Sequence, residues 1–132
     1  MFGVFVLAAA AAAQPEPNCA GTQEELNECA QRDFKQADRA LNVQWQKLVV
    51  AARRKDRTLV HDRHDPPAFE HLLKGQRAWL TYRDETCAWV QTAFGGSIAP
   101  MNSWVCMTDM TNARTKELER LARDPNDPDQ PI

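Results

Sequence analysis

One apolar stripe constrains the fold of this 132-residue chain more than any other feature. Over residues 26–52, apolar side chains recur at steps of three and four residues with mostly polar side chains between them, which is the spacing of one helix face. A helix over residues 23–54 would be roughly 48 Å long at 1.5 Å per residue, so a small domain must pack another long helix along it. The stripe comprises Leu26, Ala30, Phe34, Ala37, Leu41, Trp45, Leu48 and Ala52.

A capping box marks the beginning of this helix. Thr22 precedes Glu25 by three residues. The threonine hydroxyl can therefore accept a hydrogen bond from a free backbone amide of the first turn, and the glutamate carboxylate can accept one from the backbone amide of the capping residue.

A second helix is predicted over residues 68–94, between Pro66-Pro67 and Gly95-Gly96, which favour a helix start and a helix end. It carries two neighbouring apolar stripes, which favour a helix that contacts two partners and is therefore central in the fold. One stripe comprises Phe69, Leu73, Gln76, Leu80, Arg83, Cys87, Val90 and Phe94, and the other Leu72, Trp79, Tyr82, Trp89 and Ala93.

A third helix is predicted after an extended segment at Pro100, capped by Asn102 or Ser103 and ending near Arg123. No strand pattern or internal repeat is present. The sequence therefore predicts an all-α fold over residues 19–123, a small antiparallel three-helix bundle with long helices. Residues 124–132 are rich in proline and aspartate and are expected to form a disordered tail.

The first residues resemble a secretory signal peptide. Residues 2–13 are an uninterrupted apolar run, too short to span a bilayer, that ends in small residues before Pro15. We expect residues 1–13 to be a signal peptide that lacks its basic n-region, and the protein to be exported to the periplasm or the extracellular space. A buried amino-terminal helix is the alternative.

Four cysteines in an exported chain indicate two disulfides, since the CxxC pairs of a zinc site are absent. Antiparallel helices bring all four thiols to one end of the bundle, which is held there by the two disulfides. Three pairings are possible. We favour Cys19–Cys29 and Cys87–Cys106, because each pair is local in sequence and straddles a helix end. A cross-link between helices, such as Cys29–Cys106, is the alternative.

Arg83 lies on a stripe that is expected to be buried, so it needs a charged partner. In the antiparallel register Asp33 lies opposite Arg83, and Asp38 lies about one turn further along. We therefore expect a structural ion pair.

No constellation in the sequence indicates catalysis, a cofactor, a metal or nucleic-acid binding. Ser97 lacks a nucleophile-elbow motif, and the carboxylates are spread along helix faces. The basic run at residues 53–57 is interrupted by Asp56. His61, His64 and His71 are better explained as part of a solvated linker and its flank than as metal ligands.

The chain resembles the amino-terminal domain of the LprI-type lysozyme inhibitors over residues 19–121. The most specific parts are residues 76–87, QRAWLTYRDETC, and Gly95-Gly96-Ser97. Trp45 stands where members often have tyrosine. The other matching residues are Cys19, Thr22, Gln23, Glu25, Cys29, Ala37, Asp38, Leu41, Asn42, Cys106, Thr111, Arg114, Glu117 and Leu118.

The resemblance implies an exported helical domain, not an enzyme, that blocks a lysozyme-type muramidase. We expect the contact at a polar loop that includes Gly95, Gly96, Ser97 and Asn102. Turn geometry alone also explains the two glycines. The alternative function is a periplasmic or cell-surface binding module with another protein or envelope partner, and the sequence does not indicate an oligomeric state.

Overall fold

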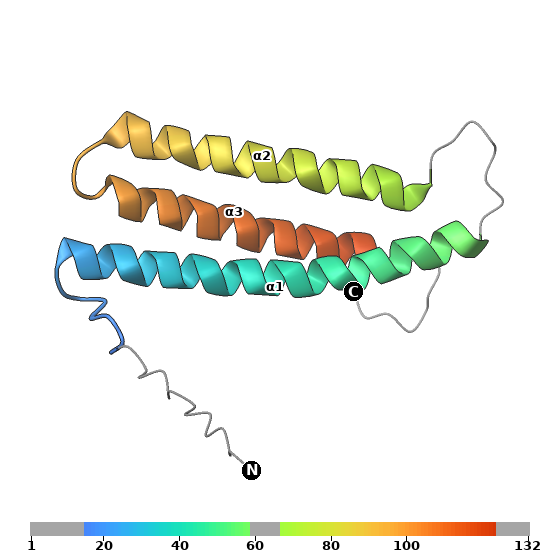
Figure 1. Cartoon of the computed structure of the whole chain (residues 1–132), viewed down its shortest axis with the longest axis horizontal. Helices are drawn as coiled ribbons and strands as arrows, with labels where there is room; N and C mark the ends of the chain where they lie inside the picture. The colour runs from blue at the N-terminus through green and yellow to red at the C-terminus, as the bar shows by residue number, and fades with distance from the viewer. Residues whose placement is uncertain (1–14, 59–66, 124–132) are drawn as a thin grey trace, which may run out of the picture.

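Three long helices form an antiparallel bundle in the computed structural model, which describes residues 15–58 and 67–123 (Figure 1). They are α1 (Gln23–Thr58), α2 (Ala68–Phe94) and α3 (Ala99–Ala122), and the described residues contain no strand. The predicted all-α three-helix bundle is confirmed. The expected signal peptide, the linker histidines His61 and His64, and the acidic tail lie outside the described residues.

The apolar stripe of α1 faces the bundle, as its spacing predicts. Ala30, Ala37, Leu41, Leu48 and Ala52 are buried, and the larger stripe residues between them are partly buried. The helix ends at Thr58, one turn beyond the predicted end.

The capping box before α1 is formed. The backbone N–H of Thr22 donates to Oε2 of Glu25 at 2.8 Å, and the backbone N–H of Glu25 donates to the hydroxyl of Thr22 at 3.3 Å. Two amides that the helix leaves free are thereby satisfied.

The central helix is α3, because it packs against both α1 and α2, whereas α1 and α2 touch each other least. The prediction that α2 is central is therefore wrong. The buried residues of α2 are Gln76, Arg83 and Cys87 on one stripe, while Tyr82 and Trp89 on the other are exposed. Apolar periodicity records which side chains share a face, but it does not say whether that face is covered.

The third helix begins at Ala99, before the predicted caps. Pro100 lies in the first turn, where the missing proline N–H costs no helical hydrogen bond, so the expected extended segment is absent. Ser103 instead donates its hydroxyl hydrogen to the carbonyl of Cys87 at 3.3 Å and so links α3 to α2.

The apolar core lies in the half of the bundle away from the α2–α3 turn. Leu41, Leu48 and Leu118 are almost fully buried there. Partly buried apolar side chains surround them, namely Trp45, Leu72, Trp79 and Ala122.

Candidate partner-binding pole

Both disulfides lie at the end of the bundle that holds the α2–α3 turn. The predicted pairing is confirmed: Cys19 bonds Cys29 with Cα atoms 5.8 Å apart, and Cys87 bonds Cys106 with Cα atoms 5.6 Å apart. The first disulfide ties the segment before α1 to α1, and the second joins α2 to α3. This end is therefore fixed by two covalent links.

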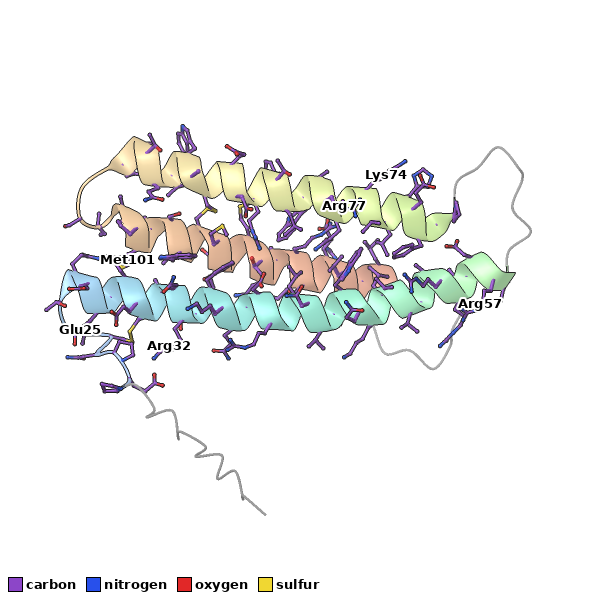
Figure 2. All side chains as sticks on the ribbon, in the orientation of Figure 1. Glu25, Arg32, Arg57, Lys74, Arg77 and Met101 are labelled. Atoms are coloured by element: carbon purple, nitrogen blue, oxygen red, sulfur yellow. A yellow bond between two sulfur atoms is a disulfide. The ribbon has the colours of Figure 1, made fainter. Side chains whose placement is uncertain are left out.

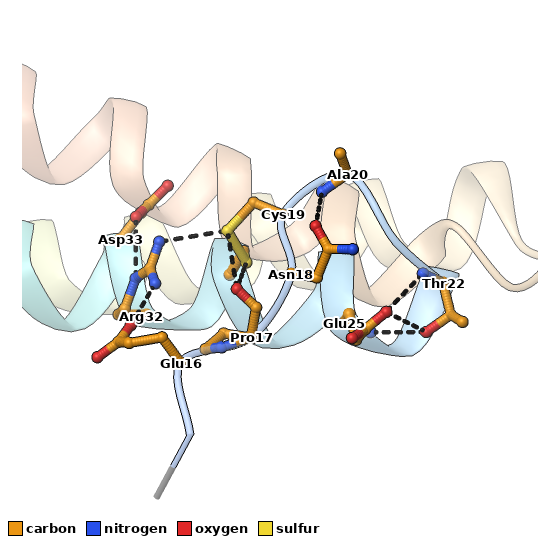
Figure 3. Close-up of a disulfide and its surroundings, with 10 residues drawn as sticks. Glu16, Pro17, Asn18, Cys19, Ala20, Thr22, Glu25, Arg32 and Asp33 are labelled. Carbon is orange, nitrogen blue, oxygen red and sulfur yellow. Dashed lines mark hydrogen bonds and ion pairs between the residues drawn. A yellow bond between two sulfur atoms is a disulfide. The ribbon is translucent and has the colours of Figure 1, made fainter. Parts of the chain in front are cut away.

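The segment before α1 folds back along that helix (Figure 3). Glu16 pairs with Arg32 at 2.7 Å, and Arg32 Nη2 lies 3.3 Å from Sγ of Cys19. A side chain on Gly21 would collide with the Glu25 carboxylate, so glycine leaves room for the capping box. The backbone N–H of Thr22 and then its hydroxyl lower the pKa of Glu25 below its ordinary value, because both donate to the charged carboxylate.

Two glycines shape the turn between α2 and α3, which we call the glycine turn (residues 95–98). Gly95 and Gly96 have φ values of 55° and 74°, a region that L side chains rarely adopt. The N–H of Gly95 donates to the carbonyl of Gln91, and the carbonyl of Gly96 accepts from the N–H of Ala99. The amides of Gly96, Ser97 and Ile98 have no hydrogen-bond partner in the described part of the chain.

The residues predicted for partner binding stay together at this turn. Gly96 and Ser97 are exposed, whereas Gly95 and Asn102 are half-buried. The backbone N–H of Asn102 donates to the carbonyl of Ile98 within the first turn of α3, so Asn102 lies just behind the turn. A groove of about 400 Å³ runs between α2 and α3 next to it, lined among others by Gln91, Pro100 and Trp104.

Three large apolar side chains of α2 that the sequence predicts to be buried, Tyr82, Trp89 and Phe94, are exposed instead, and Ile98 of the glycine turn is exposed as well. We call them the aromatic edge: Tyr82, Trp89, Phe94 and Ile98, with exposed fractions from 44% to 67%. Trp89 and Phe94 meet edge to face with ring centroids 6.3 Å apart. The charged neighbours Asp84 and Glu85 on the same helical stretch are the sequence signal that this face is open to solvent.

Charge is segregated along the bundle. Residues 15–31 and 84–113, at the end with the disulfides and the glycine turn, carry seven carboxylates and no lysine, arginine or histidine. We call this end the acidic pole. Two of its carboxylates pair with arginines that border these ranges, Glu16 with Arg32 at 2.7 Å and Asp84 with Arg83 at 2.9 Å. Figure 2 shows Glu25 and Met101 near this end and Arg57 and Lys74 near the other. The seven carboxylates belong to Glu16, Glu24, Glu25, Glu28, Asp84, Glu85 and Asp109.

Arg83 connects all three helices at the inner boundary of this pole. Its guanidinium lies 3.5 Å from Asp38 of α1 and 2.9 Å from Asp84 of α2, and it donates to the hydroxyl of Thr111 on α3 at 3.2 Å. The structure thus brings Asp38 to Arg83, while Asp33 lies 3.8 Å from Arg32 instead. Sequence reasoning did not predict that Thr111, which is fully buried, is a partner of Arg83.

Two aromatic rings enclose the same guanidinium. The rings of Phe34 and Trp79 have centroids 5.3 Å and 5.2 Å from its central carbon, close enough for cation–π attraction. A buried cation with these contacts is suited to positioning helices.

Among residues 15–58 and 67–123, no group of three or more His, Cys, Asp or Glu side chains is arranged to hold a metal ion. Of the histidines considered above, His71 is exposed on α2. No helix in the described chain has the length and apolar character that crossing a membrane requires.

Comparison with known proteins gives a family and a relative. The family model for "Lysozyme inhibitor LprI" matches residues 15–118. An uncharacterized protein of Rhizobium meliloti (strain 1021) is 42% identical over 118 residues, which cover 86% of this chain and 85% of that protein. No solved structure matches the chain.

Proposed function

The chain belongs to the LprI family of lysozyme inhibitors, and from that membership we propose that it binds and blocks a lysozyme-type muramidase through the glycine turn. The observation that carries the proposal is the extent of the family match, because residues 15–118 include both disulfides, the turn and most of the three helices. The protein acts by binding and is not itself an enzyme.

The chemistry of the turn suits the proposed target. A muramidase cleft holds a carboxylic acid and a carboxylate on either side of the scissile bond. The free amides of Gly96, Ser97 and Ile98 are donors for such groups, and the amino end of α3 adds a partial positive charge beside them. Asn102 can supply a further amide donor from the first turn of α3.

The scaffold limits the entropy that binding would cost. The Cys87–Cys106 disulfide joins the two helices that the turn connects, and Ser103 bonds the backbone of α2. A turn that is already ordered loses little conformational freedom when it enters a cleft.

We also propose that the protein is exported to a compartment in which it would meet a muramidase. Two disulfides form and persist in oxidising compartments, and the apolar run of residues 2–13 has the composition of a signal peptide.

The test is a turbidity assay of cell-wall lysis with the oxidised mature protein and several lysozyme classes. We expect at least one class to be inhibited, and Ser97→Trp to weaken the inhibition by about tenfold or more, which corresponds to roughly 1.4 kcal/mol of binding free energy. Gln46→Trp, at an exposed polar position of α1 far from the turn, is the control and should inhibit like the wild type.

Absence of inhibition at equimolar excess across the panel would defeat the proposal. Binding without inhibition would favour the alternative, an envelope protein-binding module. If Ser97→Trp inhibits as well as Gln46→Trp does, the contact lies elsewhere on the molecule.

A further inference from the structure

The aromatic edge lacks a partner within the described chain. Tyr82 and Trp89 are seven residues apart on α2, so they lie on the same face, and Phe94 extends that face to the glycine turn. Adjacent exposed apolar side chains mark protein contact sites more often than scattered ones do. Tryptophan and tyrosine are also the residues that most often dominate the binding energy of an interface.

The charges around this edge define the chemistry of its partner. Asp84 already pairs with Arg83 at 2.9 Å, and Asp109 lines the groove between α1 and α3, so Glu85 is the carboxylate that the edge offers to a partner. Glu85 lies one turn before Trp89 on the same side of α2, is exposed, and forms no ion pair with the described residues. A partner that covers the edge must therefore supply a cation to meet Glu85.

Two other occupants fit this surface less well. A second copy of the chain would place the same patch on itself, so Glu85 would meet its own counterpart as a like charge. An anionic lipid surface would be repelled by the same carboxylate. The arrangement selects a basic protein surface.

We propose that the aromatic edge is a second contact with the muramidase, in which Trp89 anchors against a basic surface beside the cleft and Glu85 pairs with a cation there. This inference rests on the proposed function, because it assumes that the glycine turn enters the cleft. The turn then blocks the active site, while the edge supplies affinity and selects basic muramidases over acidic ones.

Titration calorimetry and stopped-flow binding of the oxidised mature chain to a basic c-type lysozyme test the proposal at low and high salt. We expect Trp89→Ala to raise Kd by about thirtyfold, which corresponds to roughly 2 kcal/mol. We expect Glu85→Lys to slow association severalfold and to weaken its salt dependence. Matched controls are Leu121→Ala and Glu119→Lys, which change an exposed apolar and an exposed acidic side chain near the other end of α3.

The outcomes separate this inference from the proposed function. If the wild type binds and inhibits while both edge variants match their controls, the inference is overturned and the proposed function stands. If the wild type does not bind this basic lysozyme but inhibits another class in the panel, the inference is overturned and the proposed function stands; if it binds none of the classes, both are overturned. A wild-type dimer in sedimentation that Trp89→Ala dissociates would overturn the inference in favour of a second copy.

Discussion

The two ends of this bundle are stabilised by different means. At the acidic pole, disulfides, a capping box and hydrogen bonds fix the backbone, while large apolar side chains remain exposed. At the other end Leu41, Leu48 and Leu118 form the buried core, and the surface is mainly basic. In residues 47–58, 67–77 and 114–123 the basic side chains are Lys47, Arg53, Arg54, Lys55, Arg57, Lys74, Arg77, Arg114, Lys116, Arg120 and Arg123, against four acidic ones.

The difference shows how a small domain can keep part of its surface apolar and still be ordered. A core orders the chain by removing apolar surface from water, so it leaves little of that surface to bind a partner. Cross-links order the chain without covering side chains. The acidic pole can therefore present Trp89 and Phe94 on a fixed backbone because its order does not depend on burying them.

The largest effect is expected at the core end. Leu118→Ala removes a side chain with no exposed surface and leaves a cavity against Leu41 and Leu48, so the free energy of unfolding should fall by about 2–5 kcal/mol. Urea unfolding of the oxidised protein measures it. Leu121→Ala, whose side chain is 57% exposed, should change it by no more than about 0.5 kcal/mol. Equal effects would mean that the core is not where stability resides.

Removal of the inter-helix disulfide should come next. Cys87→Ser with Cys106→Ser opens a loop of 19 residues and should lower the free energy of unfolding by about 3 kcal/mol in the chain-entropy model. We also expect hydrogen exchange to quicken at the glycine turn while exchange around Leu48 keeps its rank among the slowest amides. An equal increase in hydrogen exchange at both ends would contradict the conclusion that the two ends are stabilised by different means.

Arg83 lies at the boundary between the two ends, and its substitution tests what the ion pair there contributes to stability. We propose that Arg83 forms a structural ion pair with Asp38 and Asp84. Arg83→Met should therefore lower the free energy of unfolding by about 1–3 kcal/mol. The value is below that of a fully buried pair because Asp38 and Asp84 are 39% and 56% exposed and can be solvated. Thermal unfolding is the measurement, with Asp38→Asn as the milder comparison. Unchanged stability would leave Arg83 available for a surface role.

The glycine inside α2 and the glycine just after its end should respond in opposite directions to substitution by alanine. Gly95→Ala should cost about 1–3 kcal/mol, because its backbone conformation is one that glycine almost alone adopts. Gly75→Ala should stabilise by about 0.5–1 kcal/mol, since Gly75 is inside a helix and nothing lies near an added Cβ. Melting temperatures of the pair measure this contrast. Destabilisation by both substitutions would show that backbone conformation is not the deciding cause at Gly95.

The smallest effect is the pH dependence of the capping box. The folded-state pKa of Glu25 is lowered, so its stabilising contribution is present above the ordinary value of 4.5 and is lost as the pH falls through the lowered value. We expect Glu25→Gln to lower the melting temperature at neutral pH and to approach the wild type in acid. Glu24→Gln, in the same helical turn but outside the box, is the control. A difference in melting temperature between the wild type and Glu25→Gln that stays constant from neutral to acid pH would refute this role.

Much of the fold follows from sequence because its signals are local. The stripe of α1, the Thr22–Glu25 box and the glycines after Phe94 each act within a few residues. The disulfide pairing was predictable for the same reason. Pro100 was misread because proline suits both an extended segment and the first turn of a helix.

The site was less predictable because it depends on contacts between helices. Asp33 and Asp38 are five residues apart on α1, so only one of them can face Arg83, and the sequence does not fix the rotation that decides it. The exposure of Trp89 was not predicted, although Asp84 and Glu85 signal an open face, because the two apolar stripes indicated a central α2 and the structure has α3 in that place. The absence of bases from Asp84 to Ala113 is visible in the sequence, but its meaning requires the antiparallel order that adds residues 15–31 to the same end.

The order of the disulfides along the chain also bears on how the protein acquires them. The first cysteine bonds the second and the third bonds the fourth, so no bond must wait for a distant segment. When the amino end emerges first, Cys29 meets Cys19 before Cys87 is present, and Cys106 then meets Cys87 with no other free thiol in the chain. Oxidation in order of emergence gives the native pairs, so maturation requires an oxidant and no reshuffling of bonds.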